Sequence, residues 1–436
     1  MMPRDRALRG RILSFVGDPA EVGEAASHLY LEDGIVLVED GRIAALGDAG
    51  DMQGRLPDNT PIDDHAGHLI LPGLIDTHIH LPQTQVIASY GAQLLDWLQK
   101  YAFVEEQKFA DPAHAARIAR FFLDELLRNG TTTAAVYGSV HMQSADALFA
   151  ESERRGTRMI AGKVMMDRGA PAALLDTAEQ GYRESKALIE RWHGRGRQRY
   201  AVSPRFAVTS SDAQLEVAGA LLAEHQGCYL QTHLTENLDE IRTVRRLFPW
   251  AKSYTDVYDR FGLLGERSLF GHCIHLDEAE LERLSASRSV AALCPTSNLF
   301  LGSGLFDLAK LRDSGRPVRA ALATDIGGGT SYSMLRTAAE AYKVVQLRGQ
   351  RWSALEAFYA ITLGNARALG LEAEIGSLEP GTEADIVVLD ARATPAMAHR
   401  METARDLAEE LFVLLIMGDE RAVRATYVMG EPVPPA

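Results

Sequence analysis

Apolar and polar positions repeat in one order along the chain: a short apolar run rich in β-branched residues, a charged stretch with helical spacing, then another apolar run. Eight apolar runs lie between residues 68 and 370, at 69–81, 131–139, 158–167, 199–209, 228–236, 268–276, 290–298 and 319–327. Helical patterns separate them, for example at 116–129, 172–192 and 243–248. Eight strands that alternate with helices predict an α/β fold, a (β/α)8 TIM-like barrel, whose usual core of about 250 residues fits within 68–374.

The two ends of the chain carry a different pattern. Residues 28–67 alternate apolar and polar positions around Asp-Gly turns, and the tail from residue 376 repeats this alternation. Neither segment is long enough to form a stable sheet alone. We therefore expect residues 1–67 and 375–436 to pair into one small β-sandwich domain beside a barrel of residues 68–374. Two separate β appendages are the alternative.

Composition narrows the classes of function. The chain has 436 residues, of which 46% are hydrophobic, and a net charge of −14, so it can bury an enzyme-sized core and offers no basic face for nucleic acid. No apolar run approaches the roughly 18 residues of a membrane span, and residues 1–15 lack the apolar core of a signal peptide. We expect a cytoplasmic enzyme that acts on a small molecule, with no nucleic-acid or membrane partner.

The strongest local motif is Asp-Thr-His-Ile-His at residues 76–80. Alternate residues of a strand share a face, so His78 and His80 can bind one ion, although such pairs also occur on solvated strands. Three other predicted strands carry a ligand-type residue near the carboxyl end, namely His233, His272 and Asp325. Because the carboxyl ends of barrel strands meet at one face, this pattern predicts a metal site there.

The type and number of metals follow from the residues available. Imidazoles with one carboxylate suit a catalytic Zn²⁺, and Fe²⁺ is possible with the same ligands. Binuclear sites on this barrel need a bridging anion, often a modified lysine on the fourth strand, but no lysine lies between Lys186 and Lys252. We therefore expect one metal per chain. The three cysteines, Cys228, Cys273 and Cys294, have no CxxC spacing and predict neither a disulfide framework nor a thiolate zinc site.

Three other residues have no assigned role at this stage. Lys163, on the third strand, is expected to be a structural cation rather than a bridging ligand. His275 follows His272 by three residues, so alternation places the two on opposite faces, and His272 is the better centred. His141 follows the second strand and could line the mouth of the pocket.

Longer motifs surround these residues. They include PGLIDTHIH (72–80), LPQTQVI (81–87), SPRFAVTS (203–210), QTHLTENLDEI (231–241), CPTSNLFLGSG (294–304), TDIGGGTSYSML (324–335) and GSLEPGTEADIVVLD (376–390). With these motifs the chain resembles the amidohydrolase superfamily and, within it, the guanine deaminases. The resemblance covers nearly the whole chain.

The resemblance implies hydrolysis of guanine, a small-molecule purine, to xanthine and ammonia by a homodimeric enzyme. It implies that zinc is held by His78, His80, His233 and Asp325, that substrate is contacted by Gln83, Arg205 and Phe206, and that Glu236 shuttles protons. Catalysis would also use Asp325 and His272 to hold the attacking water.

Two other kinds of function remain open at this stage. One is another mononuclear aminohydrolase that acts on 8-oxoguanine, a pterin, a triazine or cytosine. The other is a catalytically silent scaffold with the same fold, against which the intact ligands and Glu236 argue.

Overall fold

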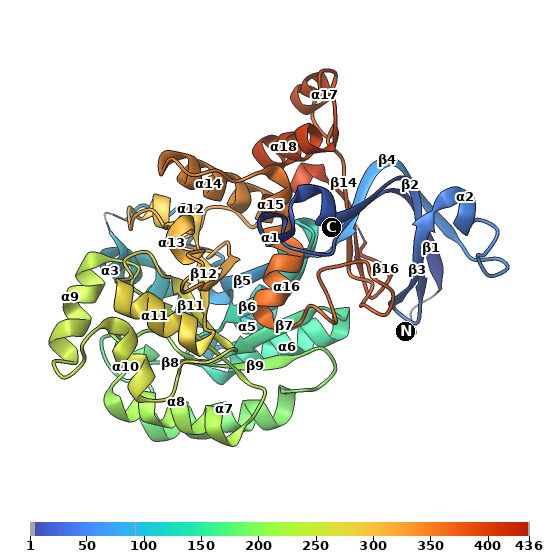
Figure 1. Cartoon of the computed structure of the whole chain (residues 1–436). Coiled ribbons are helices and arrows are strands. Elements are labelled where there is room, and N and C mark those ends of the chain that lie inside the picture. The colour runs from blue at the N-terminus through green and yellow to red at the C-terminus, as the bar shows by residue number, and fades with distance from the viewer. Residues whose placement is uncertain (1–4, 92, 435–436) are drawn as a thin grey trace.

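The computed structural model describes residues 5–91 and 93–434. At its centre, eight parallel strands form a nearly closed barrel surrounded by helices (Figure 1). The strands are β5 (Leu74–His80), β6 (Thr131–Tyr137), β7 (Arg158–Gly162), β9 (Arg199–Pro204), β10 (Tyr229–Leu234), β11 (Ser268–His272), β12 (Val290–Leu293) and β13 (Arg319–Leu322). The predicted (β/α)8 barrel is therefore confirmed. The short β8 (Val164–Met165) pairs with β9 outside this order.

Backbone hydrogen bonds join the first and last barrel strands at their carboxyl ends. The amide of Asp325 donates to the carbonyl of His78 at 2.9 Å, and the amide of His80 donates to the carbonyl of Ile326 at 2.9 Å. The loop after β13 is thereby fixed against the end of β5, and the two sequence motifs that carry ligand-type residues lie side by side.

Helices cover the outside of the barrel, and their ends follow from local sequence. They are α5 (Pro112–Arg128), α6 (Met142–Arg155), α7 (Ala178–Trp192), α8 (Asp212–Glu224), α9 (Leu238–Leu247), α10 (Tyr254–Arg260), α11 (Glu278–Ser287), α14 (Met334–Leu347), α15 (Ala354–Tyr359) and α16 (Asn365–Leu369). The α9 helix follows a strand end directly, because Asn237 and Glu240 form a capping box at its first turn. This cap stops β10 just after its ligand-type residues.

Shorter helical segments occupy the connections. They are α1 (Pro19–Val22), α2 (Ala49–Met52), α3 (Leu94–Trp97), η3 (Leu98–Ala102), α4 (Phe103–Glu106), η4 (Gln107–Ala110), α12 (Pro295–Phe300) and α13 (Leu308–Leu311). The segment from α3 to η4 lies between β5 and α5, and no periodic pattern predicted its helices. None of the helices in the described ranges is both long and apolar enough to cross a bilayer.

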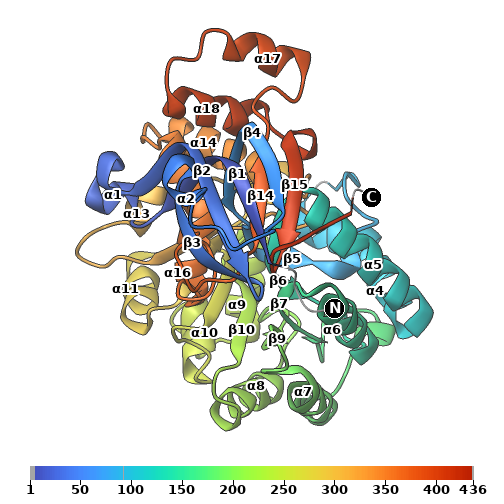
Figure 2. The same cartoon turned by 90° about the vertical axis from the view of Figure 1, so that its right-hand side faces the viewer.

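The two end segments of the chain pair with each other in one separate sheet rather than in two appendages (Figure 2). Its seven strands run in the order β16-β15-β14-β4-β1-β2-β3, and every pair is antiparallel except β1 with β4. The strands are β1 (Arg6–Phe15), β2 (His28–Glu39), β3 (Arg42–Asp48), β4 (Ile62–Pro72), β14 (Ile386–Leu389), β15 (Val423–Val428) and β16 (Glu431–Pro432). Strand β4 continues past residue 67 and leads through Gly73 into the barrel. Two helices, α17 (Pro395–Met401) and α18 (Leu407–Met417), separate β14 from β15.

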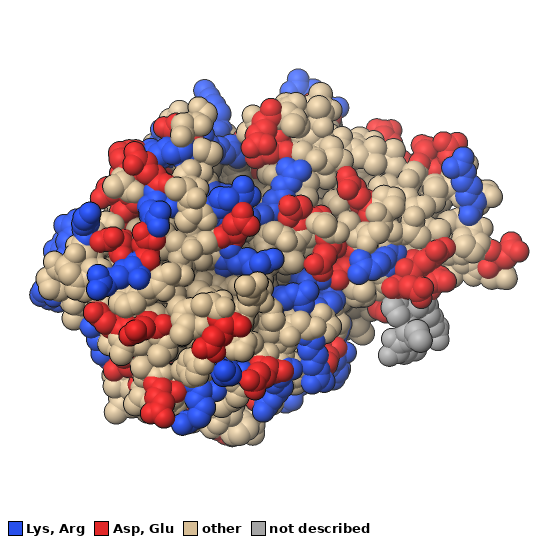
Figure 3. Space-filling model, turned by 60° about the horizontal axis from the view of Figure 1, so that its bottom comes forward, with Lys and Arg blue, Asp and Glu red and all other residues tan. Residues whose placement is uncertain are grey.

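Buried ion pairs hold the sheet segment against the amino-terminal end of the barrel. Arg158 at the start of β7 donates to Glu383 at 2.6 Å, and Arg197 donates to the same carboxylate at 2.7 Å. The side chains of Arg158 and Glu383 are 1% and 4% exposed, so water screens this pair very little. On the face that Figure 3 shows, acidic and basic side chains are interspersed. Solvent-exposed pairs such as Arg283 with Asp259 contribute much less than the buried one.

We expect Glu383→Gln to lower the free energy of unfolding by about 3–5 kcal/mol, because it leaves buried guanidinium charge without its partner. Urea denaturation followed by circular dichroism would measure the change. The exposed Glu402→Gln, which removes only a surface contact with His399, is the matched control. Equal transition midpoints for the two variants would contradict this assignment.

Candidate functional site

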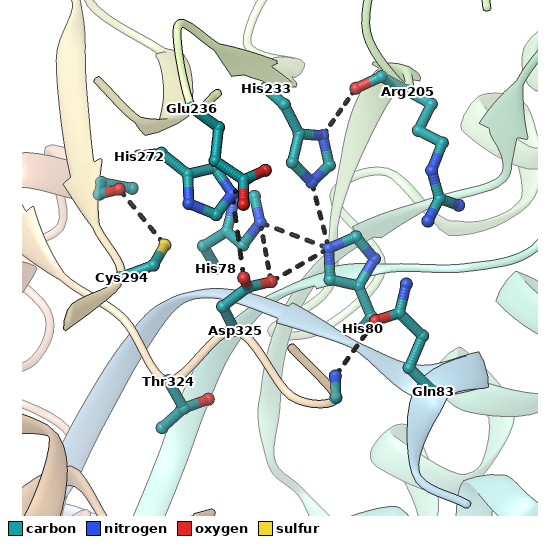
Figure 4. A network of polar contacts seen from close by, with 12 residues as sticks. His78, His80, Gln83, Arg205, His233, Glu236, His272, Cys294, Thr324 and Asp325 are labelled. Atoms are coloured by element: carbon teal, nitrogen blue, oxygen red, sulfur yellow. Dashed lines mark hydrogen bonds and ion pairs between the residues drawn. The ribbon is translucent and has the colours of Figure 1, made fainter. Parts of the chain in front are cut away.

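Four strand ends bring a compact group of imidazoles and carboxylates together at the carboxyl face of the barrel (Figure 4). His78 and His80 end β5, His233 lies in β10, His272 ends β11, and Asp325 follows β13. All five side chains are buried. The structure thus gathers every ligand-type residue that the sequence pattern singled out.

Four of these side chains place their donor atoms around one point. Nε2 of His80 lies 3.3 Å from Nε2 of His78 and 3.2 Å from Nε2 of His233. Oδ1 of Asp325 lies 3.3 Å from Nε2 of both His78 and His80. Zinc–nitrogen bonds of about 2.0–2.1 Å in a tetrahedron separate ligand atoms by about 3.3–3.4 Å. The spacing of these four donors therefore fits a single divalent ion.

The protonation of the group suits metal binding. Burial lowers the pKa of His78 and His233, and it lowers that of His80 to about 3. Burial alone would raise the pKa of Asp325, but hydrogen bonds from His78 and His80 hold it well below its usual range. The site therefore offers neutral imidazoles and an ionised carboxylate, the forms in which these residues bind metals.

The orientation of His233 is set by the backbone. Its Nδ1 lies 2.6 Å from the carbonyl oxygen of Arg205, which can only accept, so Nδ1 carries the proton and Nε2 presents its lone pair to the group. The Nδ1 atoms of His78 and His80 are buried and have no hydrogen-bond partner within the described residues. In all three rings Nε2 is the nitrogen that lies close to the other donors, so Nε2 is the atom that can bind a metal.

A second carboxyl lies beside the imidazoles. Glu236 accepts a hydrogen bond from Ser303 at 3.0 Å, and its other oxygen lies 3.3 Å from Nε2 of His272. Burial, reinforced by the charge of Asp325, raises the pKa of the Glu236 carboxyl to about 8. A carboxyl with this pKa can hold and release a proton near neutral pH, as a general acid–base group must.

Aromatic and basic side chains form a small cavity over this group. It is lined by Leu94, Trp97, Leu98, Arg205, Phe206, His233, Glu236, His272, Leu301, Asp325 and Gly328. Arg205 and Phe206 follow β9 directly, and Leu94, Trp97 and Leu98 come from α3 and η3. Gln83 is buried next to Arg205 and does not line the cavity itself.

Several buried residues that support the site were not assigned a role from the sequence. The amide oxygen of Asn298 accepts from Nδ1 of His272 at 2.8 Å and fixes that ring. Asp76 accepts from the backbone amides of His78 at 3.2 Å and Thr324 at 3.1 Å, which links the two ligand-bearing motifs. Glu106 binds both Arg205 and Gln83. Asp76 and Asn298 lie within motifs noted in the sequence, whereas Glu106 does not.

The residues without an assigned role have structural partners. Lys163 is fully buried and donates to Asp176 at 2.8 Å and Glu184 at 2.7 Å, away from the ligand group. His275 lies 2.9 Å from the carbonyl of Ser303 through Nε2. Because β11 already ends at His272, strand alternation does not apply to His275. His141 lines a separate cavity outside the site with Asp146, Asp176 and Glu184 among others.

The three cysteines are free and buried, and one of them lies close to the site. A second possible metal group consists of His78, His272, Cys294 and Asp325, whose ligand atoms lie within 4.8 Å of one another. Burial, with the charge of Asp325, raises the pKa of the Cys294 thiol well above its usual value. Since this group shares His78 and Asp325 with the first, it does not form an independent site.

Comparisons with known proteins agree on one family. Residues 69–433 match the amidohydrolase family. The chain is 47% identical to guanine deaminase of Escherichia coli K12 over 431 residues, which cover 98% of this chain and 97% of that protein. A solved structure of the E. coli guanine deaminase superposes with a TM-score of 0.95 over 99% of both chains. The C. acetobutylicum guanine deaminase, solved with guanine in its active site, is 28% identical and superposes with a TM-score of 0.87 over 99% of this chain and all of that one.

Proposed function

The chain belongs to the amidohydrolase family and, within it, to the guanine deaminases, and from this premise we propose that it hydrolyses guanine to xanthine and ammonia. One observation carries the proposal. His233 and Asp325 of the four-residue donor group, the Glu236 carboxyl with its raised pKa, and the Arg205 guanidinium next to Phe206 all border one cavity. The groups needed for water activation, for proton transfer and for recognition of a planar base therefore lie within reach of one bound ligand.

The donor set supports one Zn²⁺ per chain, held by His78, His80, His233 and Asp325, with Fe²⁺ as the other ion that such ligands accept. When bound, the ion lowers the pKa of a water to about 7 and so supplies hydroxide at neutral pH. The heteroaromatic carbon that must be attacked is a poor electrophile, which is why this supply is needed.

The proton transfers are assigned to Glu236. As water adds to C2 of guanine, a C–O bond forms, and Glu236 takes the water proton and delivers it to the adjacent ring nitrogen. Glu236 then takes the proton of the new C2 hydroxyl and passes it to the amine, so that the C–N bond breaks, ammonia leaves and C2 becomes a carbonyl. His272, 3.3 Å from Glu236 and 3.7 Å from Asp325, orients the attacking water together with Asp325.

Recognition of the base is assigned to three residues. Arg205 donates to the exocyclic oxygen of guanine, and Phe206 offers an apolar face against which the ring packs. Gln83, which both donates and accepts, binds the purine edge. The order Arg205-Phe206 directly after β9 supports this assignment, because both side chains then border the cavity.

An ammonia-release assay over a panel of purines and related amines, run with elemental analysis of the purified protein, tests the proposal. Guanine is expected to be the preferred substrate, with one divalent metal per chain. Preference for 8-oxoguanine, a pterin, a triazine or cytosine would instead identify another aminohydrolase. Release from no compound would identify a catalytically silent scaffold.

Arg205→Lys is expected to lower kcat/KM for guanine roughly 10- to 100-fold, because lysine keeps the charge but loses the planar pair of donors. Preference for guanine over adenine, expected at about 10⁴-fold in the native enzyme, should shrink as well, because adenine offers an amine where guanine offers an acceptor. Steady-state kinetics with both bases would measure these changes. The exposed Arg283→Lys is the matched control. Unchanged guanine kinetics in Arg205→Lys would remove Arg205 from substrate recognition.

The resemblance to guanine deaminases also supports a homodimer located in the cytoplasm. Analytical ultracentrifugation would test the first expectation, and fractionation of the source cells the second.

A further inference from the structure

Glu106 is a fully buried carboxylate that lies between two residues assigned to substrate recognition. It ends α4, 23 residues from Gln83 and 99 from Arg205 in the sequence. We propose that Glu106 is a positioning residue that sets the specificity of the purine pocket: it fixes the hydrogen-bonding pattern of Gln83 and Arg205, and it neutralises the guanidinium so that neutral purines bind in preference to anionic ones. This inference rests on the proposed function.

The contacts of Arg205 come from one short segment. Nη1 donates to both carboxylate oxygens of Glu106, at 2.8 and 2.7 Å, and Cζ lies 5.3 Å from the ring centre of Phe103, three residues earlier. Nε and Nη2 have no hydrogen-bond partner among the described residues, so these donors remain for a ligand. Glu106 therefore determines which edge of the guanidinium a purine can meet.

The contacts of Gln83 fix the direction of its amide. Its Nε2 donates to Glu106 at 3.1 Å, and its Oε1 accepts from the backbone amide of Gly327 at 3.1 Å. A carboxylate can only accept, so the amide cannot turn over without losing both bonds. One N–H and one lone pair remain, in a fixed order. Figure 4 shows Gln83 and Arg205 on the His80 side of the imidazole group.

The charge of Glu106 matters as much as its position. Arg205 and Glu106 are 3% and 0% exposed, so neither charge is screened by water, and the pair presents no net charge to a bound base. Without the carboxylate, a buried and uncompensated guanidinium would attract an anion. The reaction adds a second carbonyl to the six-membered ring, which makes the product easier to ionise than the substrate. A neutral pair therefore also limits retention of anionic product.

The test compares Glu106→Gln and Glu106→Asp with the native enzyme at a mildly alkaline pH, where xanthine is largely anionic and hypoxanthine largely neutral. The measurements are kcat and KM for guanine and the inhibition constants of both purines. In Glu106→Gln we expect KM for guanine to rise roughly 10- to 100-fold, the range of a charge-assisted hydrogen bond. The preference for xanthine over hypoxanthine should rise by a similar factor.

Glu106→Asp separates charge from position. It keeps the negative charge but is too short to hold both Arg205 and Gln83, so KM for guanine should rise while the xanthine-to-hypoxanthine preference stays near the native value. If Glu106→Gln does not fold, the test is the Glu106→Asp variant alone, in which KM for guanine should rise and the xanthine-to-hypoxanthine preference should not. An unchanged KM in Glu106→Asp, or equal shifts in KM and in preference, would contradict it.

Glu383→Gln is the matched control, because it also breaks a buried Arg–Glu pair but at the opposite end of the barrel. It should lower stability and leave the purine preference unchanged. If Glu106→Gln behaves like this control, Glu106 has only a structural role and the inference is overturned. Failure of the proposed function would look different, because the native enzyme itself would then release no ammonia from guanine.

Discussion

His78→Ala and His233→Ala are each expected to give a folded chain that no longer retains a divalent metal and whose guanine turnover falls to background. Each substitution removes one of four donors whose ligand atoms all lie within 4.8 Å of one another, with Nε2 of His80 at 3.2–3.3 Å from the other three. With three donors left, the ion is held more weakly, and the supply of hydroxide at neutral pH is lost. Elemental analysis and ammonia release on the same preparations would measure both effects.

The exposed His399→Ala is the matched control, since its imidazole contacts only Glu402 on the surface. It should keep native metal content and turnover. Two tightly held metals per native chain would contradict the single site. The sharing of His78 and Asp325 between the two possible metal groups is the structural reason to expect one ion.

The barrel could be predicted because its strands and helices alternate regularly along the sequence. Each apolar run ends at the carboxyl face, so residues as far apart as His78, His233 and Asp325 were expected to meet there without any knowledge of their contacts. The boundary of the seven-stranded sheet was harder to predict. Strand β4 pairs with β1 and β14 of that sheet, but its chain runs directly on into the first barrel strand. A pattern of alternation does not reveal where one unit passes into the other.

Glu106 shows what such patterns cannot predict. It lies in a series of short helical turns between β5 and α5, where neither strand alternation nor a long amphipathic repeat applies. Its importance depends on contacts with Arg205 and Gln83, both remote in sequence. A single Glu in a Val-Glu-Glu-Gln stretch is indistinguishable from its exposed neighbours until the fold buries it. Asn298 lies within the CPTSNLFLGSG motif, but its role in orienting His272 from a short helix after β12 likewise became evident only from the contact.

Glu236→Gln is expected to lower kcat by about 10²–10⁴-fold, the usual contribution of a general acid–base group, while metal content and purine binding are kept. The amide has nearly the same shape and can still meet Ser303 and His272, but it cannot take up a proton from water. Because burial and Asp325 raise the pKa of the native carboxyl to about 8, the native side chain can exist in both protonation states near neutral pH. Kinetics with guanine, elemental analysis and equilibrium binding of hypoxanthine would separate these effects.

The exposed Glu266→Gln is the control for the same chemical change away from the site, where Glu266 pairs only with the exposed Arg288. Loss of metal together with turnover in Glu236→Gln would show that the carboxylate supports the ligand group rather than moving protons. Near-native turnover would assign the transfer to another group, and His272, 3.3 Å away, is then the residue to substitute next. A slow variant with full metal and unchanged hypoxanthine binding leaves proton transfer as the step that Glu236 performs, because the substitution keeps the position and shape of the side chain and removes its ability to take up a proton.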